Sequence, residues 1–416
     1  MTIFHVLATL TTLAALAAWV NYRFVRLPMT IGLMLIGLLT SLALVALGSA
    51  GVGVVEPFTR FVRAVDFDEA LLHGMLGALL FAGALHIDLD ELLAQKGIIT
   101  LLATGGVLLS TALVGFGAWQ LFGWLGLGVP LVWALVFGAL ISPTDPIAVG
   151  AILRRAGVPR SLEIKIAGES LFNDGIGVVL FVIMLSLATG RHEVGARAVL
   201  ELFLLEAGGG VAYGAALGWL VYLMLRSVDN YQVEILLTLA LVTGGYALAN
   251  ALHLSGPLAM VVAGLLIGNR GRRMAMSEVT RGRLDAFWEL VDEFLNAVLF
   301  VLIGIEVIIL EVTPAILTAG LLAIPLVLLA RWFSVGLPVT LLRLVRAFSP
   351  AAVRIMTWSG LRGGISVALA LSLPAVPARD TLIAVTYVVV CFSILVQGLT
   401  VGPLTQRLMR RAPAGT

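Results

Sequence analysis

Residues 166–190 read IAGESLFNDGIGVVLFVIMLSLATG, a stretch of 25 residues that is long enough to cross a bilayer as one α-helix. Three polar residues, Glu169, Asn173 and Asp174, interrupt its apolar character. A carboxylate at the centre of a bilayer costs about 2.5–3.5 kcal/mol on insertion scales, so it persists only where it is paired, protonated or in use. The stretch therefore predicts a membrane-embedded site that handles ions or protons.

The composition of the whole chain is that of a membrane protein. Hydrophobic residues make up 60% of the 416 residues and charged residues 12%, with a mean hydropathy of +1.07; soluble domains are about half apolar and a quarter charged. The net charge of +2 is small and the basic residues are scattered, which argues against a nucleic-acid partner. With one cysteine, Cys391, no zinc-like spacing and no Walker loop, we expect no cofactor and neither metalloprotease nor ATPase chemistry.

Apolar runs of about 20 residues predict thirteen transmembrane helices. They lie near residues 3–20, 28–47, 69–87, 97–123, 130–152, 163–189, 198–226, 232–252, 254–268, 284–310, 314–342, 351–373 and 379–409. These runs fill the chain, so we expect a single transmembrane domain over residues 1–416 and no soluble regulatory domain.

The distribution of basic residues predicts the orientation of the chain. If the N-terminus lies outside the cell, only five of the 26 Lys and Arg residues fall in outer loops. These are Arg60, Arg63, Arg191, Arg197 and Arg379. Arg331 and Arg362 lie within apolar runs, and the other nineteen fall in inner loops. The positive-inside rule therefore places the C-terminus in the cytoplasm.

Two of the predicted spans should be broken near their middles. The fifth contains residues 142–146 (SPTDP), where two prolines remove amide donors and disfavour helical geometry. The twelfth contains residues 360–364 (GLRGG), where glycines loosen the helix around Arg362. The breaks lie seven spans apart, as expected if spans 1–6 and 8–13 form inverted repeats. Paired interrupted helices of this kind indicate the binding site of a transporter.

Helical spacing divides the polar cluster of the sixth span between two faces. Ser170 and Asp174 are four residues apart and share one face, while Glu169 points about 140° away from Asp174. We therefore expect Asp174 and Ser170 to face a cavity and to meet Asp145 there. Such a set of oxygen atoms suits hard cations.

Glu169 needs a different partner, which Arg331 or Arg362 must supply. A purely structural role as a contact between helices is plausible for Asn173 and Ser170, but it explains two aspartates within apolar spans poorly. Asp145 could also cap the helix that follows it, a role compatible with ion binding.

The tenth span opens with a series of acidic residues. They are Asp285, Glu289, Asp292 and Glu293, close to a basic loop at residues 270–283. We expect this series to form a solvated or paired face at the cytoplasmic end of the span.

Three segments together resemble a known family. Residues 142–146, 168–175 (GESLFNDG) and 360–365 (GLRGGI) are similar to segments of the monovalent cation/proton antiporters, in particular the electroneutral, NhaP-like sodium/proton exchangers. The resemblance covers the whole apolar chain. It implies a homodimer of about thirteen spans per subunit. Spans 1–3 and 7–10 would form the dimerisation part, and spans 4–6 and 11–13 the mobile core with the crossed broken helices.

The resemblance also implies roles for individual residues. Asp174 would take either the cation or the proton, and Asn173 would hold the site together. A transported Na⁺ would bind at Asp174, Asp145, Ser170 and Thr144. The Asn-Asp order of residues 173–174 is that of the electroneutral branch.

Two arginines gain structural roles from the same resemblance. Arg331 lies in the segment that supplies the partner of Glu169, and Arg362 would stabilise the unwound twelfth span. One departure concerns the third span, because many relatives carry an acidic residue where residues 79–86 (LLFAGALH) have none.

We therefore expect a multi-pass protein of the cell membrane, and not an enzyme, that exchanges Na⁺ or Li⁺ for H⁺ one to one. Exchange of K⁺ for H⁺ is the alternative within the same class. A cation channel would need a polar pore or carbonyl filter, for which no repeated motif occurs. An intramembrane enzyme would need a base near Ser170, and no histidine lies on a neighbouring turn.

Overall fold

The computed structural model describes residues 3–49, 55–64, 70–145, 150, 152–154, 156–190, 196–310, 312–342 and 351–411. All regular structure in this part of the chain is helical, which confirms the predicted all-α class. Eight helical stretches within it are long and apolar enough to cross a membrane. They are Phe4–Val25, Met29–Gly48, Lys96–Trp124, Arg160–Ala188, Val199–Arg226, Tyr231–Ala251, Pro314–Leu342 and Arg379–Arg410. The total of thirteen spans stays a prediction.

Most helices lie within the predicted apolar runs along the chain. The first half contains α1 (Ile3–Val20), α2 (Met29–Ser49), α3 (Val55–Ala64), α5 (Leu76–Leu85), α6 (Leu89–Ala94), α7 (Lys96–Leu101), α8 (Val107–Trp124), α9 (Leu131–Ile141) and α11 (Arg160–Ala188). The second half contains α12 (Ala196–Phe203), α13 (Gly209–Arg226), α14 (Tyr231–Ala251), α15 (Gly256–Leu266), α16 (Arg272–Met274), α17 (Glu278–Glu306), α18 (Pro314–Leu342), α19 (Ala352–Ser359), α20 (Gly364–Leu371), α21 (Arg379–Phe392) and α22 (Gly398–Arg411). The helices α3, α6 and α16 lie between the predicted runs.

Several long helices change their hydrogen-bonding pattern part-way. Short π-helical segments join α7 to α8 (η3, Leu102–Gly106), α12 to α13 (η4, Leu204–Gly208), α15 to α16 (η5, Ile267–Gly271) and α21 to α22 (η7, Ser393–Gln397). Others are η1 (Asn21–Val25) and η2 (Ala70–Met75), and η6 (Val307–Ile309) is a 3₁₀ turn. A π turn leaves the apolar run continuous, so apolar periodicity does not reveal it.

Polar side chains cap the helices where the chain enters them. Asn230 accepts hydrogen bonds from the backbone of α14, Ser255 from Leu258 in α15, and Ser277 from Thr280 in α17. Each such cap satisfies an amide that the helix leaves unbonded and contributes about 1 kcal/mol. The caps fix the starting points of these three helices.

Glycines allow the helices to approach one another closely. A β-carbon at Gly214 of α13 would collide with the backbone of Ala259 in α15. In the same way, α2 and α17 meet at Gly37 and Gly304. Small residues at these crossings give the close backbone packing on which helix association in membranes depends.

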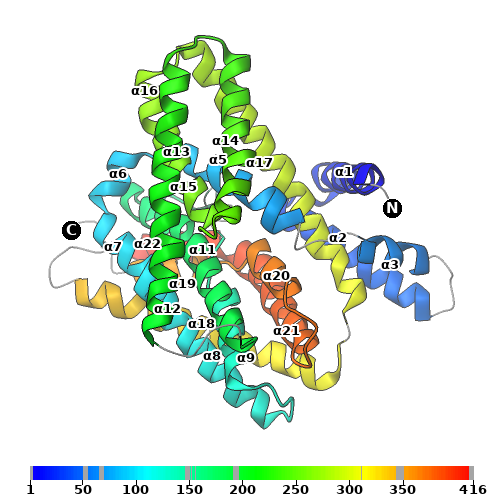
Figure 1. The fold of residues 1–416 in the computed structure, drawn as a ribbon. Helices are drawn as coiled ribbons and strands as arrows, with labels where there is room; N and C mark the ends of the chain where they lie inside the picture. The colour runs from blue at the N-terminus through cyan, green and yellow to red at the C-terminus, as the bar shows by residue number, and fades with distance from the viewer. Residues whose placement is uncertain are drawn as a thin grey trace.

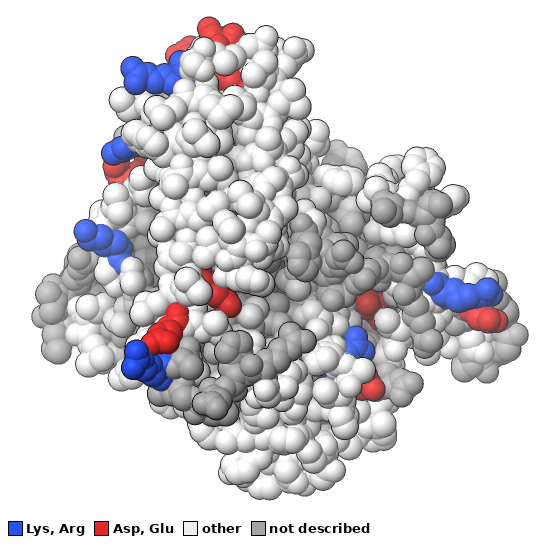
Figure 2. All heavy atoms as spheres, in the orientation of Figure 1, with Lys and Arg blue, Asp and Glu red and all other residues white. Residues whose placement is uncertain are grey.

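Two groups of helices are visible in Figure 1. The helices α13, α14 and α17 extend to the upper end of the view, and α17 also packs against α1, α2 and α5. The helices α8, α9, α18, α20 and α21 gather towards the lower end, where α18 packs against α8 and α21. The face drawn in Figure 2 is largely uncharged, as expected for a surface in contact with lipid.

Non-helical residues lie at both positions where the prolines and glycines predict a break, while the paired broken spans stay a prediction. Residues 142–145 are not helical after the end of α9, and residues 360–363 separate α19 from α20. The two interruptions touch, because the amide of Asp145 donates to the carbonyl oxygen of Leu361 at 2.7 Å. The proposed capping partner of Asp145 falls at Pro146 and beyond, outside the described residues.

Candidate ion-binding site

A cavity lies between the two interruptions and the helices α5, α11, α17 and α20. Its volume of about 60 Å³ leaves room for a few water molecules. It is lined by Leu71, Leu76, Leu79, Leu80, Gly83, Pro143, Asp145, Leu171, Asp174, Asn296, Leu299, Gly363, Gly364, Ile365 and Ser366. The structure thus brings Asp145 and Asp174 to one cavity, as the spacing on the sixth span predicts.

Asp174 is the central acidic residue of this cavity. Its side chain comes from the middle of α11 and is 4% exposed. Its Oδ1 atom has no hydrogen-bond partner among the described residues. The charges that act on it are those of Asp145, Glu169 and Arg362. A buried carboxylate without full hydrogen bonding is costly, so this oxygen is available to a proton or a cation.

Asp145 enters the cavity from the non-helical segment after α9. Its carboxylate lies directly against Gly363, where an added β-carbon would be 2.5 Å from Oδ2. The missing side chain at Gly363 therefore makes room for the carboxylate. The hydrogen bond from the amide of Asp145 to Leu361 holds the same segment in place. The non-helical residues 360–363 therefore position the carboxylate of Asp145.

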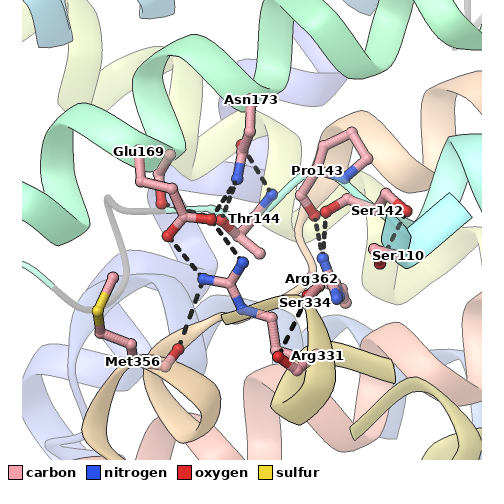
Figure 3. A network of polar contacts seen from close by, with 11 residues as sticks. Ser110, Ser142, Pro143, Thr144, Glu169, Asn173, Arg331, Ser334, Met356 and Arg362 are labelled. Atoms are coloured by element: carbon pink, nitrogen blue, oxygen red, sulfur yellow. Dashed lines mark hydrogen bonds and ion pairs between the residues drawn. The ribbon is translucent and has the colours of Figure 1, made fainter. Parts of the chain in front are cut away.

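Asn173 ties the non-helical segment to α11 (Figure 3). Its Oδ1 accepts from the amide of Thr144 at 3.2 Å, and its Nδ2 donates to the hydroxyl of Thr144 at 2.8 Å and to Glu169 at 3.2 Å. The hydroxyl of Thr144 also lies 2.9 Å from that of Ser170. Ser170 therefore faces Thr144 and is not among the residues that line the cavity, although it shares a helix face with Asp174.

Glu169 is fully buried and lies against Arg331 of α18. Nη1 and Nη2 of Arg331 donate to its two carboxylate oxygens at 2.5 and 2.7 Å. The arginine crosses Gly360, where an added β-carbon would be 2.6 Å from its Nε. This two-pronged pairing orients the guanidinium and satisfies both oxygens of Glu169.

Arg362 bonds to a segment other than its own. Its Nη1 donates to the carbonyl oxygens of Ser142 and Pro143, the latter at 2.9 Å. Its amide donates to the hydroxyl of Ser393 in η7 at 2.8 Å. The sequence pointed to stabilisation of the twelfth span alone. In the structure the guanidinium also donates to two carbonyl oxygens of the non-helical segment after α9.

Two polar residues that line the cavity were not predicted from the sequence. Asn296 of α17 and Ser366 of α20 are 4% and 1% exposed, and each has a side-chain oxygen without a partner in the described part of the chain. The third-span segment contributes only apolar atoms, from Leu79, Leu80 and Gly83. Asn296 is a lone amide in an apolar run, which was the available signal.

The acidic series at the start of α17 divides in two. Asp285 pairs with Arg272, as a paired face requires. Asp292 lies two helical turns further on, and its Oδ1 is buried without a partner among the described residues. Glu289 and Glu293 are exposed and Asp292 is half-buried, so the series is solvated or paired as expected, with Oδ1 of Asp292 as the exception.

Comparison with known proteins places this chain in a family. Residues 11–407 match the family model described as "Sodium/hydrogen exchanger, transmembrane". The chain is 49% identical to the Na⁺/H⁺ antiporter NhaP of Pseudomonas aeruginosa over 411 residues, which cover 98% of this chain and 97% of the relative. It is 34% identical to the Na⁺/H⁺ antiporter NhaH of Halobacillus dabanensis, with 93% of each chain covered.

A solved structure shows the same fold. The sodium proton antiporter MjNhaP1 of Methanocaldococcus jannaschii superimposes with a TM-score of 0.75 over 98% of this chain and all of that one, at 19% identity. With its apolar helices, the chain is a multi-pass membrane protein. It belongs to the sodium/hydrogen exchanger family.

Proposed function

We propose that this protein is a secondary antiporter that exchanges Na⁺, or Li⁺, for H⁺ at the cavity between the interrupted helices. The observation that carries the proposal is the buried oxygen of Asp174, which has no partner among the described residues and faces a cavity shared with Asp145. The relatives named above are Na⁺/H⁺ antiporters, which supports the same choice of ions for this chain.

Competition for one carboxylate provides the coupling. A bare charge on Asp174 is costly to carry through the bilayer because the surrounding cavity is mostly apolar. A proton removes that charge and a monovalent cation neutralises it, so either ion permits the movement of the site. The empty, charged site does not move, and exchange results without ATP.

Each neighbouring residue then has a part in the exchange. Asp145 adds a second carboxylate near the cation, whereas the hydroxyls of Thr144 and Ser170, which contact each other and do not line the cavity, would have to turn towards it to bind the ion. Asn173 fixes the non-helical segment without adding charge. Arg362 holds the carbonyls of that segment. With a single exchanging charge, one proton is exchanged for one cation.

The movement itself follows from the family's architecture. We assign spans 1–3 and 7–10 to a dimerisation part and spans 4–6 and 11–13 to a core that moves against it, so that the cavity opens alternately to each side. The protein would work as a homodimer in the cell membrane, with the N-terminus outside and the C-terminus in the cytoplasm. The loop charges support that orientation.

Flux through purified, reconstituted protein tests the proposal. Proteoliposomes with an imposed pH gradient and a trapped pH-sensitive dye should report proton movement on addition of Na⁺ or Li⁺. A panel that includes K⁺ and choline distinguishes sodium from potassium exchange. Proton movement that is independent of every cation, or cation flux without proton movement, would overturn the antiporter.

A further inference from the structure

The cavity has a third polar side, which comes from α17. Asn296 is 4% exposed and lines the cavity together with Asp145 and Asp174. It lies on a different helix from either aspartate. The residues of α5 that line the cavity, Leu76, Leu79, Leu80 and Gly83, carry no polar side chain. Besides the two aspartates, the polar side chains that line the cavity are the amide of Asn296 and the hydroxyl of Ser366.

The orientation of this amide follows from its contacts. Its Nδ2 donates to the backbone carbonyl oxygen of Asp292 at 2.8 Å. Only the NH₂ end of an amide can face a carbonyl oxygen, because two acceptors repel each other. The remaining atom, Oδ1, is buried and has no partner among the residues that the structure describes. A buried acceptor in this state favours a ligand that supplies positive charge or a proton donor.

We infer that Oδ1 of Asn296 is a ligand of the transported cation, an inference that rests on the proposed function. Na⁺ and Li⁺ are hard cations that bind carboxylate and carbonyl oxygens, and a dehydrated ion needs several of them. A proton needs only one oxygen, that of Asp174. Asn296 therefore sets the affinity and selectivity for cations and adds no charge, so the one-to-one exchange is preserved.

Another residue of the same helix lines the cavity without an amide and provides a matched control. Leu299 lies on α17 three residues beyond Asn296 and also lines the cavity. Replacement of Leu299 by Met changes the packing of the cavity without removing an oxygen. Replacement of Asn296 by Ala or Leu removes the oxygen and keeps the charge of the site.

The experiment compares Asn296→Ala, Asn296→Leu and Leu299→Met in proteoliposomes and in detergent. We expect the half-saturating Na⁺ concentration to rise at least about tenfold in both Asn296 variants, the effect of losing one bond to a charged group. The ratio of Na⁺ to Li⁺ half-saturation should change as well. Leu299→Met should keep that ratio even if its maximal rate falls.

Thermal unfolding provides a second readout that does not need transport. Added Na⁺ should raise the unfolding temperature of the wild type. It should raise that of the Asn296 variants less, although all of these proteins should unfold at the same temperature without Na⁺. If one of the two Asn296 variants folds poorly, the comparison uses the other Asn296 variant. Wild-type half-saturation and Na⁺/Li⁺ ratio in a folded Asn296 variant would overturn the inference. Absence of exchange in the wild type would instead overturn the proposed function.

Discussion

Glu169 and Asp174 are buried carboxylates five residues apart on the same helix, yet their surroundings differ. Both oxygens of Glu169 accept hydrogen bonds from Arg331, and Asn173 donates to one of them. Asp174 faces a cavity, and its Oδ1 has no such partner in the described part of the chain. A satisfied ion pair has one stable arrangement, whereas an unsatisfied carboxylate can exchange ligands. From this comparison we expect Glu169 to act in stability and Asp174 in transport.

The strongest test of this comparison is Asp174→Asn, which should reduce cation-driven proton flux to the background of empty liposomes. The amide has nearly the same shape but neither releases a proton nor neutralises a cation. Asp380→Asn is a suitable control because Asp380 is exposed at the start of α21 and should leave flux unchanged. Substantial flux in a folded Asp174→Asn protein would remove this residue from the site.

Glu169→Ala should act on stability. Loss of one member of a buried ion pair leaves the other charge uncompensated and typically costs about 3–5 kcal/mol. Thermal unfolding in detergent should show this loss, and Arg331→Ala should show a similar one.

The double variant of Glu169 and Arg331 decides whether the two residues are coupled. It should be more stable than the sum of the two single losses implies, because removing both charges leaves neither one buried alone. Strictly additive losses would mean that the pair does not stabilise the fold as a unit.

A smaller effect is expected when the space for Asp145 is filled. A β-carbon in Gly363→Ala would lie 2.5 Å from the carboxylate of Asp145, so that side chain must move. Overpacking of this kind costs about 1–3 kcal/mol, less than loss of the ion pair. We expect exchange to fall severalfold with a modest loss of thermal stability. Gly282→Ala, with open space around the added carbon, serves as the control. Unchanged exchange would show that the position of Asp145 is not limiting.

The parts of the site that local spacing determines were predictable from the sequence. Helical geometry separates Glu169 from Asp174, and the prolines and glycines predict both interruptions. The partner of Glu169 is 162 residues away, and local spacing alone left Arg331 and Arg362 as equal candidates. The family resemblance selected Arg331, and the structure places it there.

Other features depend on packing that no local pattern encodes. Ser170 shares a face with Asp174, but the segment after α9 lies close enough for Thr144 to take up its hydroxyl. Asn296 reaches the cavity only because α17 packs beside α5 and α20. The guanidinium of Arg362 crosses to the other interruption for a similar reason, since two non-helical segments are in direct contact.

The smallest expected effect is that of membrane voltage. In the proposed cycle, one exchanging carboxylate carries either one proton or one monovalent cation per crossing, and neither Asn173 nor Asn296 adds charge. Opposed half-cycles of equal charge move no net current, so exchange should stop when the Na⁺ and H⁺ concentration ratios are equal. The measurement is the endpoint of exchange in proteoliposomes with potentials imposed by valinomycin and K⁺, after a control shows that K⁺ itself drives no exchange. A potential of 100 mV acts on each net charge with about 2.3 kcal/mol, which would shift the endpoint of a cycle with one uncompensated charge roughly fiftyfold in the Na⁺ ratio. An endpoint that moves with voltage would mean that Asp145 also changes its charge during transport. The site would then contain two exchanging carboxylates beside the fixed ion pair of Glu169 and Arg331.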